Sequence, residues 1–166
     1  MGKKLLIQHD NVPGIETLEV YRQHGGYASV EKALKSMAPN DVVEEVKKSG
    51  LRGRGGAGFP TGMKWSFLAK PEGVERYLVC NADESEPGTF KDRYLMEKIP
   101  HALIEGMITS SYALGAKTSY IYIRGEYFYV ARILEKAIEE AYAAGWLGKN
   151  ILGTSFSHDC YVQVGG

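Results

Sequence analysis

The sequence predicts an α/β fold, in which a parallel sheet carries helices on its faces. Three short runs, residues 76–80, 118–123 and 159–164, have the composition of strands, and longer helical patterns separate them. A helix between two strands of one sheet forms a right-handed crossover, so the strands are expected to be parallel. With 166 residues the chain can bury roughly 70% of its unfolded surface, which is enough for a core without disulfides or metals.

Three helical patterns precede the first strand, at residues 16–24, 29–37 and 41–49. In the third, Asp41 and Glu44 have the spacing of a capping box, so Asp41 is predicted to cap the helix, and Gly50 follows its end. We therefore expect two parts in the chain, an N-terminal helical extension over residues 1–49 and an α/β domain over residues 50–166.

The segment after the third helix is rich in glycine. Six of the thirteen residues from Gly50 to Gly62 are glycine, and arginine and lysine side chains flank them. Glycine has no Cβ, so this backbone can adopt positive φ angles and approach a ligand closely. Exposed N–H groups beside fixed positive charge suit a phosphate. Residues 50–60, called the glycine loop below, are therefore predicted to bind an anion.

The glycine loop contains a known nucleotide-binding motif, but the segment before it is not the one that this motif usually follows. Gly53, Gly55 and Gly58 satisfy the G-x-G-x-x-G pattern of dinucleotide-binding βαβ units. That pattern should follow a strand, whereas here a helix precedes it, so the motif alone is weak evidence for an ordinary unit of this kind. Residues 62–69 are predicted to form a short helix whose N-terminus faces the glycines.

An acidic turn over residues 81–88 leaves the carboxyl end of the first predicted strand. It contains Asn81, Asp83, Glu84 and Glu86. Ligands of open α/β sheets bind at the carboxyl ends of strands, so the turn is expected to meet the glycine loop. Its spacing lacks the pattern of a calcium loop, and no metal is expected. The carboxylates either form a solvated turn or bind the hydroxyls and ring edge of a cofactor.

Other side chains near the loop also have two interpretations. Phe59 and Phe67 either pack in the core or stack on a purine or nicotinamide ring. Lys64 is either a solvated helix residue or an anion or flavin contact. The sequence continues with Tyr120, Tyr122, Tyr127 and Tyr129, which we interpret as half-buried sheet and helix aromatics.

The second half of the chain supplies the remaining elements. Residues 101–114 and 129–144 are predicted helices, the first with proline near its start and Gly115 at its end. The chain reaches Gly165-Gly166 directly after the third strand. A strand that ends in a glycine pair normally leads into another ligand-facing loop. We therefore expect the sequence to be part of a longer polypeptide.

The composition excludes several classes of function. Twenty basic and twenty acidic residues give a net charge of zero, which argues against a broad nucleic-acid surface. Cys80 and Cys160 are eighty residues apart, so this chain alone cannot build a zinc site or an iron–sulfur cluster, and we predict buried free thiols. The four histidines show no ligand spacing and are assigned surface or capping roles. Without a long apolar run or a signal peptide, the chain is expected in the cytosol.

Two long motifs carry a family resemblance. GLRGRGGAGFPTGMKW begins at Gly50, and NADESEPGTFKDR begins at Asn81. On these motifs and their separation, residues 25–166 closely resemble the flavin- and NADH-binding subunit of respiratory complex I (NADH–quinone oxidoreductase). The family includes diaphorase subunits of NAD-linked hydrogenases and formate dehydrogenases. The resemblance implies a Rossmann-like but atypical α/β domain that holds FMN, with NADH stacked over the flavin.

The resemblance also assigns roles to residues of the two motifs. It places Gly53, Arg54, Gly55, Gly56 and Lys64 at the flavin, with Asn81, Asp83 and Glu84 at its ribityl chain and ring. It places Phe59, Phe67 and Glu86 at the NADH, with Glu86 as the candidate catalytic residue. Ala57, Gly58, Thr61 and Gly62 complete the candidate cofactor-binding set.

The implied reaction is hydride transfer from NADH to FMN, followed by one-electron transfer to iron–sulfur clusters of partner segments. The implied partners are a thioredoxin-like [2Fe–2S] subunit and the large iron–sulfur subunit of the peripheral arm, in a cytoplasmic complex peripheral to the membrane. The family's next flavin motif and its [4Fe–4S] cysteines are expected beyond Gly166, so this chain alone is expected to bind FMN poorly. The alternatives are a soluble diaphorase, or a docking fragment that has lost the cofactor.

Overall fold

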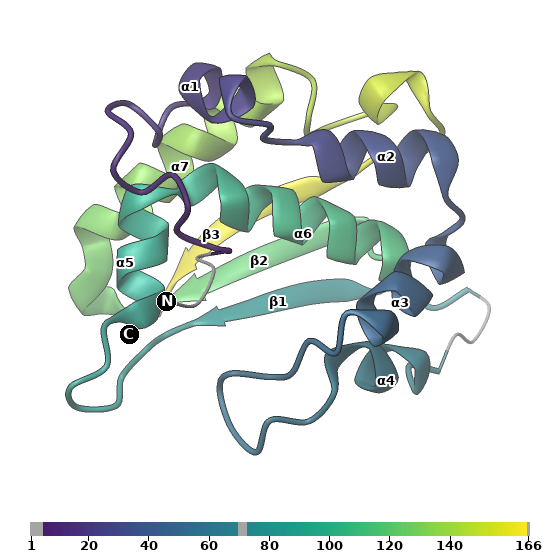
Figure 1. Ribbon diagram of the computed structural model, residues 1–166, viewed down its shortest axis with the longest axis horizontal. Coiled ribbons are helices and arrows are strands. Elements are labelled where there is room, and N and C mark those ends of the chain that lie inside the picture. Colours follow the sequence, from purple (N-terminus) through teal and green to yellow (C-terminus); the bar gives the residue numbers. More distant parts are fainter. Residues whose placement is uncertain (1–4, 70–72, 166) are drawn as a thin grey trace.

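The computed structural model describes residues 5–69 and 73–165, so Gly166 of the C-terminal glycine pair lies outside the described residues (Figure 1). A sheet of three parallel strands has the order β1-β2-β3. The strands are β1 (Tyr77–Ala82), β2 (Thr118–Ile123) and β3 (Asp159–Val164). The α/β class is confirmed, and so are the bounds predicted for β2 and β3. The first strand runs two residues further than predicted.

Helices connect the strands in sequence. Between β1 and β2 lie α5 (Lys91–Lys98) and α6 (Pro100–Leu114), and between β2 and β3 lie a 3-10 turn η1 (Gly125–Tyr127), α7 (Phe128–Ala143) and a second turn η2 (Ile151–Gly153). The predicted helices at 101–114 and 129–144 agree with α6 and α7 within one residue. The sequence analysis missed α5.

Among the described residues, helices cover one face of the sheet. Ile121 of β2 and Cys160 of β3 are buried on the face against which α6 and α7 pack. On the opposite face the neighbours Val79, Tyr120 and Tyr161 align across the three strands, and Val79 is 61% exposed. Parallel sheets are usually covered on both faces. The part of the chain that the structure describes therefore leaves the second face of the sheet open.

The N-terminal part consists of three helices that pack on this α/β unit. They are α1 (Leu18–Gln23), α2 (Ala28–Ser36) and α3 (Pro39–Lys48). Tyr27 and Val30 belong to the same buried cluster as Ile104 of α6 and Ile121 of β2. The N-terminal helices therefore share the core of the sheet, while the predicted division at residue 49 stays a prediction.

The start of α3 corrects one prediction. The helix begins at Pro39, and the N–H of Ala38 donates to Oδ2 of Asp41 at 2.9 Å. Asp41 is therefore the third residue of the helix and not its cap, so the capping box predicted with Glu44 is wrong. The reason is that proline has a fixed φ suited to the first helical position, which moves the start two residues earlier.

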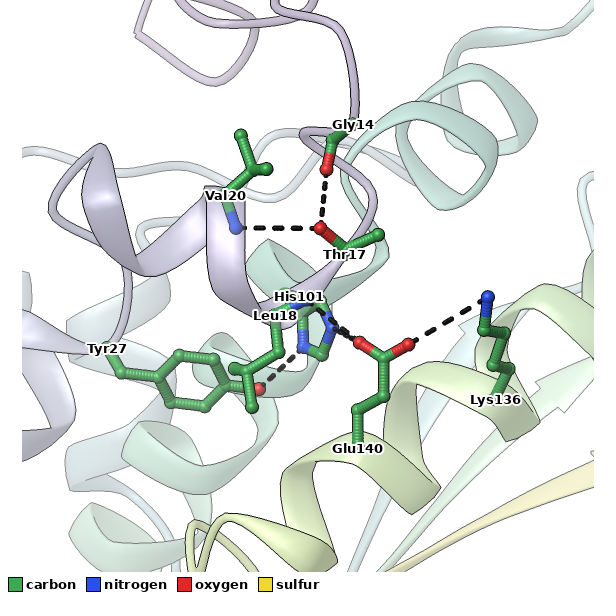
Figure 2. Close-up of polar contacts among 8 residues, drawn as sticks. All are labelled: Gly14, Thr17, Leu18, Val20, Tyr27, His101, Lys136 and Glu140. Carbon is green, nitrogen blue, oxygen red and sulfur yellow. Dashed lines mark hydrogen bonds and ion pairs between the residues drawn. The ribbon is translucent and has the colours of Figure 1, made fainter.

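Buried histidines are a second correction. His101 and His158 are fully buried, so surface or capping roles are wrong for these two. Figure 2 shows His101 between two polar partners, with its Nδ1 3.0 Å from the Tyr27 hydroxyl and its Nε2 3.1 Å from Oε2 of Glu140. His158 Nε2 lies 2.9 Å from the hydroxyl of Ser119. A neutral imidazole with such partners can pack in a core.

The same carboxylate of Glu140 also holds the beginning of α1. Its Oε2 accepts the N–H of Leu18 at 2.8 Å (Figure 2). Burial alone would raise the pKa of Glu140, but the hydrogen bonds from Leu18 and His101 outweigh it and lower that pKa. Glu140 therefore links α1, α6 and α7 through one charged group.

Candidate functional site

The base of the glycine loop is closed by backbone hydrogen bonds. The N–H of Gly53 donates to the carbonyl of Phe59 at 3.0 Å, and the N–H of Thr61 donates to the carbonyl of Leu51 at 2.8 Å. Arg52 adds a bond from Nη1 to the carbonyl of Gly58 at 3.2 Å. The loop thus projects as a narrow hairpin whose tip, residues 54–57, is exposed.

Three glycines of the region are explained by the fold itself. Gly50 and Gly58 have φ angles of 67° and 69°, a conformation that other residues adopt only with strain. Gly62 lies in α4 (Thr61–Ser66), where an added Cβ would stand 2.5 Å from the backbone nitrogen of Lys47. This glycine allows α4 to pack closely on α3.

The other three glycines are not explained by the fold. Gly53, Gly55 and Gly56 do not have positive φ. A Cβ at Gly55 or Gly56 would meet no atom within 4 Å, and one at Gly53 would make only an ordinary contact at 3.8 Å. The expectation that the glycines serve positive φ angles therefore holds only for Gly50 and Gly58 in the loop. The remaining three leave open backbone that a ligand can approach.

The glycine loop and the acidic turn face each other across a cleft of about 590 Å³. In Figure 1 the loop lies beside the free edge of β1, and the turn leaves the carboxyl end of that strand. The residues that line the cleft are Arg54, Gly55, Asn81, Asp83, Glu84, Ser85, Glu86, Thr89, Lys91 and Asp92. The structure thus brings the two segments together, as their positions in the predicted sheet implied.

Two cations of the predicted site, one on the cleft wall and one on α4, have no protein partner among the described residues. Within the described residues, neither the guanidinium of Arg54 nor the ammonium of Lys64 makes a hydrogen bond or an ion pair. Lys91, by contrast, pairs with Asp92 at 2.6 Å. Unpaired cations beside open backbone amides are suited to bind an anion. The chemistry of the loop therefore fits the phosphate end of a nucleotide cofactor such as FMN.

The acidic turn is ordered by its own polar groups. The N–H of Asp83 donates to Oδ1 of Asn81 at 3.1 Å, and the Ser85 hydroxyl donates to Oδ2 of Asp83 at 2.5 Å. Glu84 has a left-handed backbone with φ of 44°. Its carboxylate accepts the N–H groups of Asp92 and Arg93 at 2.7 and 2.8 Å. The turn is therefore ordered by local hydrogen bonds, while residues 85–88 remain exposed to solvent.

Nine predicted site residues lie outside the wall of the cleft, on the rest of the loop and on α4. They are Gly53, Gly56, Ala57, Gly58, Phe59, Thr61, Gly62, Lys64 and Phe67. The rings of Phe59 and Phe67 are 6.3 Å apart and 49% and 69% exposed, so they do not pack in the core formed by the described residues. Exposed paired rings beside the loop are available for stacking on a planar ligand.

The sequence analysis missed four residues of the cleft wall, Ser85, Thr89, Lys91 and Asp92. The last two belong to α5. Leu95, Met96 and Ile99 have the i, i+1, i+4 spacing of an amphipathic helix, a signal that could have revealed it.

A second cavity, of about 400 Å³, lies between β1, α5 and α6. Its walls are mainly apolar, with Leu78, Leu95 and Met107 among them. Cys80 also lines it, and burial raises the pKa of this thiol to about 11, so it is not a reactive thiolate near neutral pH. This cavity lacks the cations that an anionic cofactor requires.

Comparison with known proteins identifies the family of this chain. Residues 46–165 match the family described as the Nuo51 FMN-binding domain. The chain belongs to this family. The match includes the whole glycine loop, the acidic turn and the three strands, and α4 to α7 lie inside it. The geometry described above is thus the geometry of a Nuo51-type domain with an α/β, Rossmann-like fold.

Members of the Nuo51 family are similar over nearly all of this chain. It is 53% identical over 165 residues to the NADH-quinone oxidoreductase F 2 subunit of Rhizobium meliloti (strain 1021), a match that covers 99% of this chain and 39% of that protein. The NADH-quinone oxidoreductase F subunit of Aquifex aeolicus (strain VF5) is 55% identical over 161 residues, or 97% of this chain and 37% of that protein. The chain therefore spans about two fifths of the length of these curated relatives.

Solved structures with the same fold come from a hydrogenase. An NAD⁺-reducing [NiFe]-hydrogenase in the air-oxidised state matches 98% of this chain and 25% of its own, with a TM-score of 0.70 and 34% identity. The same kind of enzyme in the H₂-reduced state has a TM-score of 0.71 and 36% identity, and 26% of its chain is covered. In the part of our chain that the structure describes, no helix is long and apolar enough to cross a membrane.

Proposed function

We propose that this chain is the FMN-binding part of an NADH dehydrogenase module. The observation that carries the proposal is the open backbone of Gly53, Gly55 and Gly56, three glycines that the fold does not need, opposite an ordered acidic turn. Arg54 supports it, because this cation lines the cleft without a protein partner in the described part of the chain. Membership of the Nuo51 family points to the same cofactor.

The residues fit FMN in the following way. The open glycines, Arg54 and Lys64 would hold the phosphate end. Asn81, Asp83 and Glu84 would bind the ribityl chain and ring edge, since carboxylate and amide oxygens accept hydrogen bonds from hydroxyl and ring N–H groups. Phe59 and Phe67 would stack on the nicotinamide nucleotide, and Glu86 would face it. When bound, the flavin accepts a hydride from NADH and releases electrons one at a time.

The activity, cofactors and partners of the whole protein belong to the same proposal. We propose that hydride moves from NADH to FMN and that electrons pass to iron–sulfur clusters, including a [4Fe–4S] cluster held by another part of the polypeptide. The partners would be a thioredoxin-like [2Fe–2S] subunit and a large iron–sulfur subunit, in a cytoplasmic assembly peripheral to the membrane. We also propose that residues 1–49 form an N-terminal helical extension and residues 50–166 the cofactor-binding α/β domain.

The hydrogenase structures favour a second candidate, a diaphorase subunit of a soluble NAD-linked enzyme. Both candidates use the same FMN site, so the fold does not separate them. The genes beside the coding sequence would do so, because hydrogenase or formate dehydrogenase genes accompany a diaphorase, whereas genes for the other complex I subunits accompany a complex I flavoprotein.

An FMN titration of the chain tests the proposal. Flavin fluorescence should be quenched on binding, and Gly55→Val should weaken binding by tenfold or more, about 1.4 kcal/mol, because its side chain fills the open approach to the backbone. Gly106→Val is the matched control, since a Cβ at Gly106 also meets no atom within 4 Å. Because the unmodified chain is expected to bind FMN weakly, the titration extends to saturating FMN. No quenching there would favour a docking fragment without cofactor, and equal affinities for both variants would remove the loop from the site.

A further inference from the structure

The acidic turn has a strained position at Glu84. Its φ angle of 44° lies in the left-handed region that residues with a Cβ rarely adopt. Among residues 81–88, Gly88 also has a positive φ angle, but glycine adopts this conformation without strain. Contacts with other segments of the chain are therefore needed to hold the backbone of Glu84 in this conformation.

The first restraint is the carboxylate of Glu84 itself. Its two oxygens accept the N–H groups of Asp92 and Arg93, the second and third residues of α5. Phe90, at the cap position of α5, offers no side-chain acceptor. These amides would otherwise lack partners, and the positive end of the helix dipole favours a carboxylate there. Both oxygens are thus directed to α5, which packs against α6 and α7.

The second restraint is Arg124, which directly follows β2. Its Nη1 donates to the backbone carbonyl of Glu84 at 3.2 Å. Its Nε and Nη2 donate to the carboxylate of Glu126 at 3.0 and 2.6 Å, and its guanidinium lies over the Tyr127 ring at 5.4 Å. The hydrogen bond from Arg124 lowers the pKa of Glu126 to about 2, so this pair remains charged. The guanidinium is therefore fixed before it contacts Glu84.

We propose that Glu84 and Arg124 are positioning residues of the FMN site, and that they act by fixing the acidic turn so that Asn81, Asp83 and Glu86 face the cleft. The inference rests on the proposed function and refines it, because it moves Glu84 from direct contact with the flavin to support of its neighbours. The neighbours line the cleft with groups that bind hydroxyls, whereas the carboxylate of Glu84 is already occupied.

Two variants and their combination test the proposal. Arg124→Ala removes the bond to the Glu84 carbonyl, and Glu84→Gln replaces one acceptor oxygen by an amide that opposes an N–H donor. Each should weaken FMN binding by about tenfold in the fluorescence titration. The double variant should weaken it hardly further, since both residues hold the same turn. Arg124→Lys should recover part of the affinity, because an ammonium can still reach a carbonyl.

Arg132→Ala is the matched control. Arg132 also carries a guanidinium over an aromatic ring and an ion pair with Glu135 at 2.7 Å, but it lies on the exposed side of α7. This variant should bind FMN as the unmodified chain does. The visible circular dichroism of bound flavin adds a readout that general stability would not move, and it should change in Arg124→Ala at saturating FMN.

A measurement without FMN separates this inference from the proposed function. Trypsin should cut after Arg93 several times faster in Arg124→Ala and Glu84→Gln than in Arg132→Ala, because the turn no longer anchors α5. If the unmodified chain binds no FMN even at the highest concentrations of the titration, the proposed function fails, and the cleavage rates still decide whether these residues hold the turn. Unchanged cleavage, unchanged affinity in Arg124→Ala, or effects that simply add in the double variant would overturn the proposal.

Discussion

The ring of Tyr27 stacks on the indole of Trp146, with the ring centroids 4.6 Å apart and an angle of 28° between the planes. Tyr27 immediately precedes α2, whereas Trp146 follows α7, so the contact joins the N-terminal helices to the connection between α7 and β3. The Tyr27 side chain is fully buried, and its hydroxyl lies 3.0 Å from Nδ1 of His101. Stability of the sheet therefore depends on the N-terminal helices.

Tyr27→Ala tests this dependence. We expect the free energy of unfolding to fall by about 3–5 kcal/mol, the usual cost of removing a large buried aromatic side chain. Urea denaturation followed by circular dichroism gives the value. Tyr129→Ala is the control, because Tyr129 is 51% exposed, and it should cost far less. Equal losses for the two variants would contradict a shared core.

Gly62→Ala tests the packing of α4 on α3. The new methyl group would stand 2.5 Å from the nitrogen and 2.8 Å from the Cα of Lys47, so the helices must separate. Overpacking of this kind costs about 1–3 kcal/mol. Gly106→Ala, which meets no atom within 4 Å, should not destabilise the chain. If both variants unfold at the same urea concentration, α4 does not depend on this contact.

Lys64→Ala tests the proposed contact with the flavin. Loss of a charge-assisted hydrogen bond of about 1.5–3 kcal/mol should weaken FMN binding roughly 10- to 150-fold. Lys35→Ala removes an exposed lysine from α2, where it pairs with Glu31 at 2.6 Å, and should leave the affinity unchanged. An affinity for Lys64→Ala within about twofold of the unmodified chain would exclude Lys64 from the site.

Stability should decrease as the pH falls below neutrality. Burial lowers the pKa of His158 to about 4, and the backbone at Ala116 and the nearby Asp159 carboxylate offset this only in part. The unfolded chain therefore binds a proton near pH 6.5, before the folded chain does, and the folded state loses about 2 kcal/mol between pH 7 and pH 5. His101 contributes in the same direction, because burial lowers its pKa as well. Urea denaturation at several pH values measures the loss, and in His158→Gln the loss should be smaller.

The sequence predicted the sheet well because its signals are local. The alternation of residues 118–123 and 159–164 matches a sheet with one buried and one open face, so β2 and β3 were located to the residue. The start of α3 was missed because the spacing of Asp41 and Glu44 imitated a capping box two residues after the true start at Pro39. The existence of α5 was missed because Phe90 offers no side-chain cap and the acceptors come from Glu84. The burial of His101 and His158 depends on partners 39 residues or more away in the sequence.

The candidate site could be predicted only in part. Glycine density and flanking cations marked the loop, and the acidic turn was expected at the end of β1. The sequence does not distinguish Gly62, which serves helix packing, from Gly55, which faces open space. It also gives no sign that Arg124 reaches the carbonyl of Glu84, forty residues earlier in the chain. Such relationships come from the tertiary structure alone.

Three short helices of this protein begin on a carboxylate that another segment supplies. Glu140 accepts the first amide of α1, Glu105 accepts the amide of Ser29 in the first turn of α2, and Glu84 accepts two amides of α5. First-turn amides normally exchange their hydrogens with solvent quickly, because they lack acceptors. Here fraying is expected to start at the C-terminal turns, and the N-terminal amides of these helices should be the slower to take up deuterium.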